Sequence, residues 1–333
     1  MAPGPRAPLG DRVRVVDGGL GSTLEARGAD LAAPLWSAKA LVEQPGLVQQ
    51  VHEAFFRAGA DVAVTASYQV SAEGFRRAGR SAAEATTALR RSVELARAAA
   101  DEVGAEFGGE RLVAASVGPY GAIVADGSEY HGRYERTAAE LTAFHRARIE
   151  VLEDAGPDLL AVETLPTLTE ALAVLDALDR DGPPVWVSFT AVAGGRTAGG
   201  DDLAAVGPLV AAHPRVAAIG VNCTAEADVA DALDALAPTA LPLVACPNAG
   251  GEWDAHARCW RYAGVGATDG GLAASWVARG ARLVGGCCGV APDDIALLAA
   301  ALPHRGRLAS DAGSRTVARS RSNDRGGGNT RHM

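Results

Sequence analysis

The sequence lacks the features that are typical of nucleic-acid-binding, membrane-spanning and secreted proteins. It contains one lysine, Lys39, and its net charge at pH 7 is −9. This acidic balance argues against non-specific binding to nucleic acids or to anionic membranes. No apolar run approaches the ~18 residues that a membrane-spanning helix needs. The N-terminus also lacks the apolar segment of a signal peptide, so we expect a cytoplasmic protein whose partners are small molecules. The oligomeric state stays open.

The usual metal motifs are missing as well. No Cys-x-x-Cys pair and no His-x-x-x-His occurs, which argues against zinc fingers and zincins. The seven histidines form no cluster, and we expect His52 and His145, which lie in helical patterns, to face solvent. Five cysteines, an odd number without a secretion signal, favour reduced thiols over a disulfide framework.

What the chain does contain is a regular alternation of short apolar runs and amphipathic helical patterns. Eight runs are expected to be buried strands, at residues 13–16, 61–66, 112–117, 158–162, 184–189, 217–222, 241–245 and 282–284. This count is typical of a single parallel (β/α)8 TIM barrel. A doubly wound open sheet is the competitor, but it would gather the reactive residues at one switch point. In this chain the reactive residues follow nearly every apolar run, which favours the barrel.

Three boundaries follow from the composition. We expect the barrel over residues 13–304, a flexible N-terminus over residues 1–12, and a disordered tail over residues 305–333. The tail is rich in Arg, Ser, Gly, Asn and Asp and has almost no apolar residues, so it cannot bury a core. Ser81 with Glu84, and Thr167 with Glu170, have capping-box spacing at the start of two predicted helices.

Three cysteines carry the strongest chemical signal. Cys287 and Cys288 follow a Gly-Gly turn at the end of the eighth strand, and Cys223 ends the sixth. Adjacent cysteines bridge each other poorly, whereas two thiolates on one turn can converge on a metal ion. Three thiolates with a fourth position open are the pattern of a catalytic zinc site. We expect Cys246, at the end of the seventh strand, not to be a ligand.

Two carboxylates also end apolar runs. Asp17 and Glu163 are costly there unless they meet a partner or face solvent, and a barrel mouth supplies both. A salt bridge between adjacent loops is the simpler alternative for each. The glycines after Asp17 allow backbone N–H groups to approach a ligand closely. Loop aromatics are scarce, so Trp36, Tyr68 and Tyr130 stand out as candidate contacts.

Taken together, the motifs resemble those of the zinc-dependent homocysteine S-methyltransferases, in order, from about residue 13 to residue 302. The subgroup that uses S-methylmethionine, with S-adenosylmethionine as a lesser donor, is the most similar. The segments that carry the resemblance are residues 17–25, 66–69, 116–122, 163–164, 220–223, 247–248 and 285–288.

The resemblance implies a (β/α)8 barrel in which Cys223, Cys287 and Cys288 bind Zn²⁺. It further implies that Asp17, Gly18 and Glu163 hold the amino-acid end of homocysteine. Five more residues are expected at the substrates: Asn222 and Tyr68 lie in matching segments, and Trp36, Glu129 and Tyr130 are candidates for holding the sulfonium. Two positions depart from the family pattern: Cys246 replaces an aromatic residue, and Gly289 replaces an arginine.

The implied reaction moves a methyl group from a sulfonium to the thiol of homocysteine and forms methionine. A free thiol has a pKa of about 8.5, so little of it is thiolate at neutral pH, and zinc ligation would remove that proton. The leaving group is a neutral thioether and needs no general acid. The alternatives are a selenocysteine or betaine-dependent methyltransferase, and a non-catalytic zinc or thiol sensor.

Overall fold

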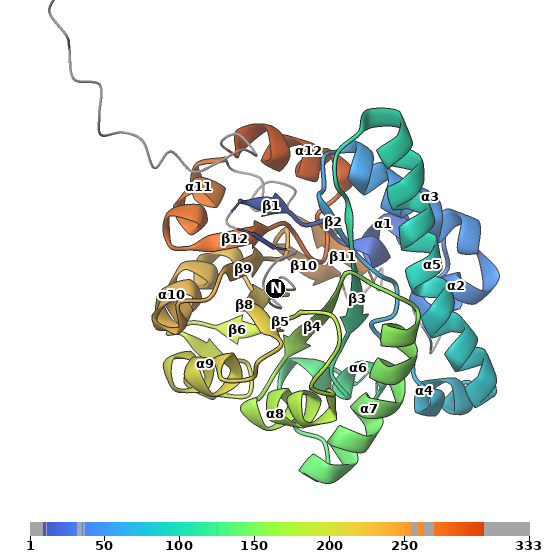
Figure 1. Cartoon of the computed structure of the whole chain (residues 1–333), viewed down its shortest axis with the longest axis horizontal. Helices are drawn as coiled ribbons and strands as arrows, with labels where there is room; N and C mark the ends of the chain where they lie inside the picture. Colours follow the sequence, from blue (N-terminus) through green and yellow to red (C-terminus); the bar gives the residue numbers. More distant parts are fainter. Residues whose placement is uncertain are drawn as a thin grey trace, which may run out of the picture.

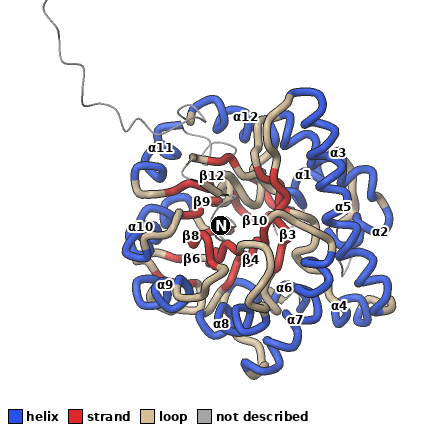
Figure 2. Tube along the Cα trace, viewed as in Figure 1, coloured by secondary structure: helices blue, strands red, loops and turns tan. Residues whose placement is uncertain are grey.

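Eight parallel strands form a ring at the centre of the molecule, and helices surround it (Figures 1 and 2). The structure is a computed structural model and describes residues 9–10, 12–31, 35, 37–124, 126–254, 259–262 and 270–302. The strand order is β1-β12-β9-β8-β5-β4-β3-β2, and a parallel bridge between Val16 and Val62 closes the ring. The predicted (β/α)8 barrel is therefore confirmed, and the open sheet is excluded.

The eight barrel strands coincide with the eight predicted apolar runs to within about three residues at either end. They are β1 (Arg14–Val15), β2 (Val62–Val64), β3 (Leu112–Val117), β4 (Leu159–Leu165), β5 (Val185–Phe189), β8 (Val216–Asn222), β9 (Leu243–Cys246) and β12 (Ala281–Val284). Two short antiparallel hairpins were not predicted, because they are brief and carry no apolar run. They are β6 (Ala191–Val192) with β7 (Arg196–Thr197), and β10 (Gly251–Asp254) with β11 (Cys259–Tyr262).

The helices follow the strands in chain order and cover the outside of the ring (Figure 1). They are α1 (Leu20–Ala26), α2 (Ser37–Glu43), α3 (Pro45–Arg57), α4 (Ala72–Arg77), α5 (Ala82–Phe107), α6 (Gly121–Val124), α7 (Ala138–Asp154), α8 (Leu168–Ala177), α9 (Leu203–Ala211), α10 (Glu226–Leu236), α11 (Gly270–Ala278) and α12 (Pro292–Ala301), with 3₁₀ turns η1 (Ser128–Tyr130) and η2 (Ala237–Thr239). None of the helices in the described part is long and apolar enough to cross a bilayer.

The core has two layers, as the strand sequences require. Side chains that point into the ring, among them Leu159, Trp186 and Leu283, pack together inside the barrel. Side chains that point outward pack against the apolar faces of the helices. This is why the barrel strands are buried on both faces and read as continuous apolar runs. The floor of any site at the mouth is thus a filled core.

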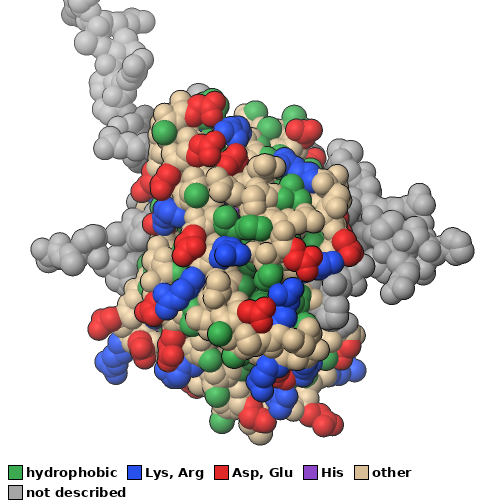
Figure 3. All heavy atoms as spheres, turned by 90° about the vertical axis from the view of Figure 1, so that its right-hand side faces the viewer, with side chains coloured by type: hydrophobic (Ala, Val, Ile, Leu, Met, Phe, Trp, Pro, Cys, Tyr) green, Lys and Arg blue, Asp and Glu red, His purple; other side chains and the backbone are tan. Residues whose placement is uncertain are grey.

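The outer surface is charged and mixed in sign. Figure 3 shows acidic and basic side chains interspersed over one flank, with apolar atoms scattered between them. Ion pairs form within helices, as between Arg57 and Glu53 of α3 at 3.1 Å, and between a helix and a loop, as between Arg97 of α5 and Asp158 at 2.7 Å. The predicted flexible segment 1–12 and disordered tail 305–333 lie outside the described residues, except for residues 9, 10 and 12.

Helix N-termini show which capping boxes form. The box at Ser81 and Glu84 is complete, as predicted, and Thr137 with Glu140 forms another. The predicted box at Thr167 and Glu170, at the start of α8, is only half formed. The Thr167 hydroxyl accepts a hydrogen bond from the Glu170 backbone N–H, but the Glu170 side chain does not accept one from the Thr167 backbone N–H. That side chain turns inward instead.

Glu170 meets His145 in the dry interface between α7 and α8. Its Oε1 accepts from the Tyr120 backbone N–H at 2.6 Å and lies 3.0 Å from Nε2 of His145. Burial raises the pKa of Glu170 to about 8 and holds the pKa of His145 well below its usual value. The expectation that His52 and His145 face solvent is wrong: both are completely buried, because each lies on the apolar face of its helix.

The raised pKa of Glu170 predicts a pH-dependent stability. Its protonated form favours the native state, so this contribution is complete below the ordinary pKa of 4.5 and is lost as the pH rises through about 8. Glu170→Gln stays neutral. We expect the melting temperature of this variant, relative to the parent, to rise steadily between about pH 5 and pH 8 in thermal melts.

Glu140→Gln is the matched control, because Glu140 occupies the same helical position on the surface. The pKa of Glu140 is lowered by its bonds to Thr137, so its stabilising charge is already complete above the ordinary pKa of 4.5. Its variant should show a constant deficit over the same pH range. A constant difference for Glu170→Gln as well would contradict the prediction.

Candidate functional site

Three thiols converge at the carboxyl-terminal mouth of the barrel. Cys223 directly follows β8, and Cys287 and Cys288 lie in the turn after β12, with β9 between the two strands. The Cys223 sulfur lies 2.7 Å from that of Cys287 and 3.8 Å from that of Cys288. All three sulfurs lie within 4.8 Å of one another, a group that can hold one metal ion. The predicted meeting of these strand ends is confirmed.

The turn that carries the adjacent thiols is held by its neighbours on both sides. The Cys287 N–H donates to the Pro247 carbonyl at 2.8 Å, and the Cys288 N–H donates to Asn248 Oδ1 at 3.2 Å. On the other side, the Gly289 N–H donates to the Ser22 hydroxyl at 3.1 Å. The loop after β9 and the first turn of α1 therefore hold the backbone that carries both sulfurs.

Glycine is needed at two points of this contact. A Cβ at Gly18 would lie 2.3 Å from the Val290 carbonyl oxygen, so any side chain would push the β1 loop away from the thiol turn. Gly289 has φ +81°, a conformation that L side chains rarely adopt. The departure from the family pattern at Gly289 thus coincides with a backbone that favours glycine.

Backbone strain is concentrated at the same mouth. Cys223 (φ +49°) and Thr164 (φ +61°) are two of the three described non-glycine residues with positive φ. Such conformations cost free energy and persist where the surroundings hold them. The Cys223 N–H donates to the Cys246 carbonyl at 3.2 Å, and its own carbonyl accepts from Thr190. The left-handed turn aims the Cys223 sulfur across β9 toward Cys287.

Asn222 links the thiols to the half-buried carboxylate of Glu163. Its Oδ1 accepts from the Thr164 N–H and from the Ser188 hydroxyl, each at 2.7 Å. Because Oδ1 accepts two hydrogen bonds, the orientation of the amide group is determined, and Nδ2 points toward Glu163 and Cys287. Nδ2 donates to Glu163 Oε2 at 3.3 Å and lies 3.9 Å from the Cys287 sulfur. Ser116 donates to the other Glu163 oxygen.

The carboxylates at the mouth lie in a negative environment. Burial, and then the charge of Cys287, raises the pKa of Glu163 to about 8, against hydrogen bonding from Ser116 and the charge of Arg148. Asp17 is 1% exposed, and its Oδ2 accepts from the Val64 N–H at 2.9 Å. Burial, with Glu163 and Cys287 nearby, raises its pKa well above the usual range. A bound cation would relieve this crowding of acidic groups.

A second group of side chains faces the thiols from the loops after β2 and β3. Burial, followed by the charges of Glu129, Tyr130 and Cys223, raises the pKa of Tyr68. The charge of Cys223 is the largest cause that raises the pKa of Tyr130, although the residue is 45% exposed. Burial and the charge of Cys287 raise the pKa of Glu129. The charges of the thiols therefore act on all three candidates, and Trp36 lies outside the described residues.

Cys246 is close to the centre but separate from it. Its side chain belongs to the packed interior of the barrel, and burial raises the pKa of its thiol, with Cys287 and Asp17 contributing. It is not among the described residues whose ligand atoms converge. Because its side chain packs inside the ring, Cys246 ends an apolar run without joining the three thiols.

Sequence reasoning missed the supporting residues. Ser116 lies in a matching segment, but nothing in the pattern shows that its hydroxyl meets Glu163. Ser188 lies in an apolar strand as an ordinary small residue. Arg148 lies in an amphipathic helix and has no sequence signal, yet its charge reaches Glu163.

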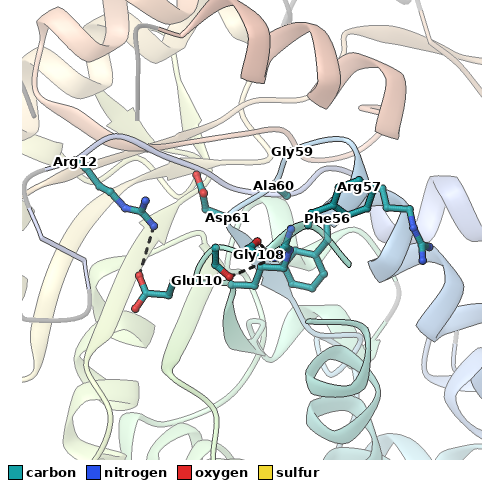
Figure 4. A pocket seen from close by; sticks show the side chains of 11 residues that line it. Arg12, Phe56, Arg57, Gly59, Ala60, Asp61, Gly108 and Glu110 are labelled. Atoms are coloured by element: carbon teal, nitrogen blue, oxygen red, sulfur yellow. Dashed lines mark hydrogen bonds and ion pairs between the residues drawn. The ribbon is translucent and has the colours of Figure 1, made fainter. Parts of the chain in front are cut away.

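A cavity of about 370 Å³ opens at the opposite end of the barrel (Figure 4). It lies where β2 and β3 begin, between Phe56, Asp61 and the pair formed by Arg12 and Glu110. In barrels of this kind the amino-terminal face serves stability, and chemistry belongs to the carboxyl-terminal face. This cavity is therefore not the candidate active site.

Comparison with known proteins agrees with this geometry. The family model described as "Homocysteine S-methyltransferase" matches residues 14–302. The homocysteine S-methyltransferase of Escherichia coli is 45% identical over 293 residues, covering 86% of this chain and 94% of the relative. Homocysteine S-methyltransferase YbgG of Bacillus subtilis is 41% identical, with 86% and 93% covered. The selenocysteine methyltransferase of Astragalus bisulcatus is 40% identical, with 85% and 90% covered.

A solved structure leads to the same family. The metallated form of the homocysteine methyltransferase MmuM from Escherichia coli superposes with a TM-score of 0.80 at 43% identity, and the match covers 89% of this chain and 99% of that one. The match of the family model extends from β1 to the end of α12 and includes all three converging thiols. The chain belongs to the homocysteine S-methyltransferase family.

Proposed function

We propose that Cys223, Cys287 and Cys288 hold Zn²⁺ and that the chain transfers a methyl group from a sulfonium donor to the thiol of homocysteine. The convergence of the three sulfurs is the observation that carries this proposal. Three thiolates and one open position are the ligand set of a catalytic zinc ion. When bound, zinc would supply the charge that removes the proton from the incoming thiol at neutral pH.

The residues present fit such an ion. A tetrahedral zinc ion with bonds of about 2.3 Å separates its sulfurs by about 3.8 Å. The sulfurs of Cys223 and Cys288 are 3.8 Å apart, and those of Cys223 and Cys287 are 2.7 Å apart. Holding the ion therefore requires the sulfurs of Cys223 and Cys287 to move apart by about 1 Å.

The acidic side of the mouth suits the amino-acid end of homocysteine. We assign the ammonium group to Glu163 and Asp17, because Asp17 is buried, Glu163 is half-buried, and both are crowded by other acidic groups. Asn222 would place Glu163 at a set distance from the thiols. Gly18 would let the β1 loop pack against Val290 of the thiol turn, beside the substrate. The thiol of the same substrate then reaches the open metal position.

The donor belongs on the side of Tyr68, Glu129 and Tyr130, with Trp36 as a further candidate. A sulfonium is a cation and favours aromatic faces and a carboxylate. In the reaction the homocysteine sulfur forms a bond to the methyl carbon, and the bond from that carbon to the sulfonium sulfur breaks. The departing electron pair neutralises the sulfonium, so the product is a neutral thioether and no proton donor is needed. Alignment then supplies most of the catalysis.

S-methylmethionine is the donor we propose, with S-adenosylmethionine as a lesser one. Selenocysteine is the second acceptor to test, because the relative from Astragalus bisulcatus carries that name at 40% identity. A betaine donor and a non-catalytic thiol sensor remain the other outcomes of a donor panel. We place the protein in the cytoplasm, where free thiols stay reduced.

Removal of one sulfur tests the metal site. Cys288→Ala should reduce the zinc content from about one equivalent to near zero and abolish methyl transfer, because two thiolates no longer enclose the ion. Elemental analysis and turnover with S-methylmethionine measure both effects, and circular dichroism checks the fold. Cys246→Ala is the matched control and should keep its zinc. Normal zinc content in Cys288→Ala would refute the ligand assignment.

Glu163→Gln tests the amino-acid site. The amide keeps the shape of the side chain but not the charge that meets the ammonium group. We expect the homocysteine KM to rise about tenfold or more while the donor KM changes less than about twofold. Steady-state kinetics with each substrate varied in turn measures this, and the exposed Glu150→Gln serves as a control. An equal rise in both KM values would count against the assignment.

A further inference from the structure

A buried arginine lies directly behind the proposed homocysteine site. Arg148, on α7, is 2% exposed. Its Nη1 donates to the Gly118 carbonyl at 3.0 Å, and its Nη2 donates to the carbonyls of Ser67 and Tyr68 at 3.0 and 2.7 Å. The guanidinium thus joins the loops after β2 and β3, both of which belong to the mouth of the barrel.

The hydrogen-bond partners of Arg148 do not neutralise its positive charge. Among the described residues Arg148 forms no ion pair, and its acceptors are three neutral carbonyls. Burying a cation without a counter-ion is costly, and the Phe144 ring at 5.5 Å offsets only part of this cost. Burial lowers the pKa of Arg148 only to about 10, so the group is still charged at neutral pH.

The charge acts on the substrate site. Glu163 and Tyr68 are the two groups whose charge favours the protonated form of Arg148. Arg148 in turn favours the ionised form of Glu163, against burial and the charge of Cys287. Arg148 is therefore a positive charge that stabilises Glu163 when this carboxylate is ionised.

The loops that Arg148 joins carry neighbours of that carboxylate. The Ser67 hydroxyl donates to the Ser116 carbonyl at 2.7 Å, and the Ser116 hydroxyl donates to Glu163. A Cβ at Gly118 would lie 2.5 Å from the Tyr68 ring, so this ring lies directly on the backbone of the next loop. A shift of either loop would move Tyr68 or disturb the hydrogen bond from Ser67 to the backbone of Ser116, the residue that donates to Glu163.

We propose that Arg148 is a positioning residue for the homocysteine site. It fixes the loops after β2 and β3 against each other, and its charge keeps Glu163 available to the ammonium group of the substrate. This inference rests on the proposed function, because it takes homocysteine as the ligand of Glu163. It adds a residue that touches neither substrate nor metal.

Three substitutions separate charge from hydrogen bonding. Arg148→Met removes both, Arg148→Gln keeps a neutral donor, and Arg148→Lys keeps the charge. We expect the homocysteine KM to rise about tenfold or more in the Met and Gln variants, with kcat within about threefold of the parent. The donor KM should rise by a smaller factor, because Arg148 also holds the Tyr68 carbonyl on the donor side. Arg148→Lys should restore the homocysteine KM to within about threefold. Calorimetric titration with homocysteine should show the same order of affinity.

Arg215→Met is the matched control. Arg215 is also 2% exposed and donates to the carbonyls of Pro183 and Asp179, but it precedes β8 at the opposite end of the barrel. Its loss should lower the melting temperature and leave the homocysteine KM unchanged. Zinc content and thermal melts on every variant show that the fold and the metal site persist.

The outcomes are distinct. If Arg148→Gln behaves as the parent, or if Arg148→Lys is no better than Arg148→Met, the charge has no positioning role and the inference is overturned. It is equally overturned if Arg215→Met raises the homocysteine KM as much as Arg148→Met. An inactive parent protein with zinc bound would instead overturn the proposed function.

Discussion

The convergence of three sulfurs at one rim of the barrel is the constraint on which the rest of the site depends. Parallel strands deliver their carboxyl ends to the same face, so thiols that follow β8 and β12 meet across the end of β9. The loop after β9 also holds the thiol turn in place, because it accepts hydrogen bonds from the N–H groups of Cys287 and Cys288. The left-handed backbone at Cys223 turns the third sulfur toward the other two.

A high density of negative groups is the electrostatic consequence of this arrangement. Three thiols, Asp17 and Glu163 gather in a partly dry mouth, and burial raises the pKa values of both carboxyl groups. The negative charge of these groups, when they are ionised, is poorly compensated until cations bind. A divalent metal ion, an ammonium group and a sulfonium are all cations, and each has a group of side chains that suits it. Arg148 is a positive charge of the protein itself that favours the ionised form of Glu163.

The chemistry needs little beyond placement. Methyl transfer from a sulfonium releases a neutral thioether, so the buried histidines are free for structural roles. His145 accordingly packs against Glu170 between α7 and α8, away from the mouth.

The sequence alone determined the strands, the barrel and the three thiols, because each depends on a local pattern: an apolar run, its spacing, and a reactive residue at its end. It also placed Asp17 and Glu163 at the mouth by the same rule. The hairpins could not be predicted in this way because they have no apolar run. The roles of Ser116, Ser188 and Arg148 were decided only by the tertiary structure. A hydroxyl or a guanidinium chooses its partners by distance in space, and those partners lie 30 to 81 residues away along the chain.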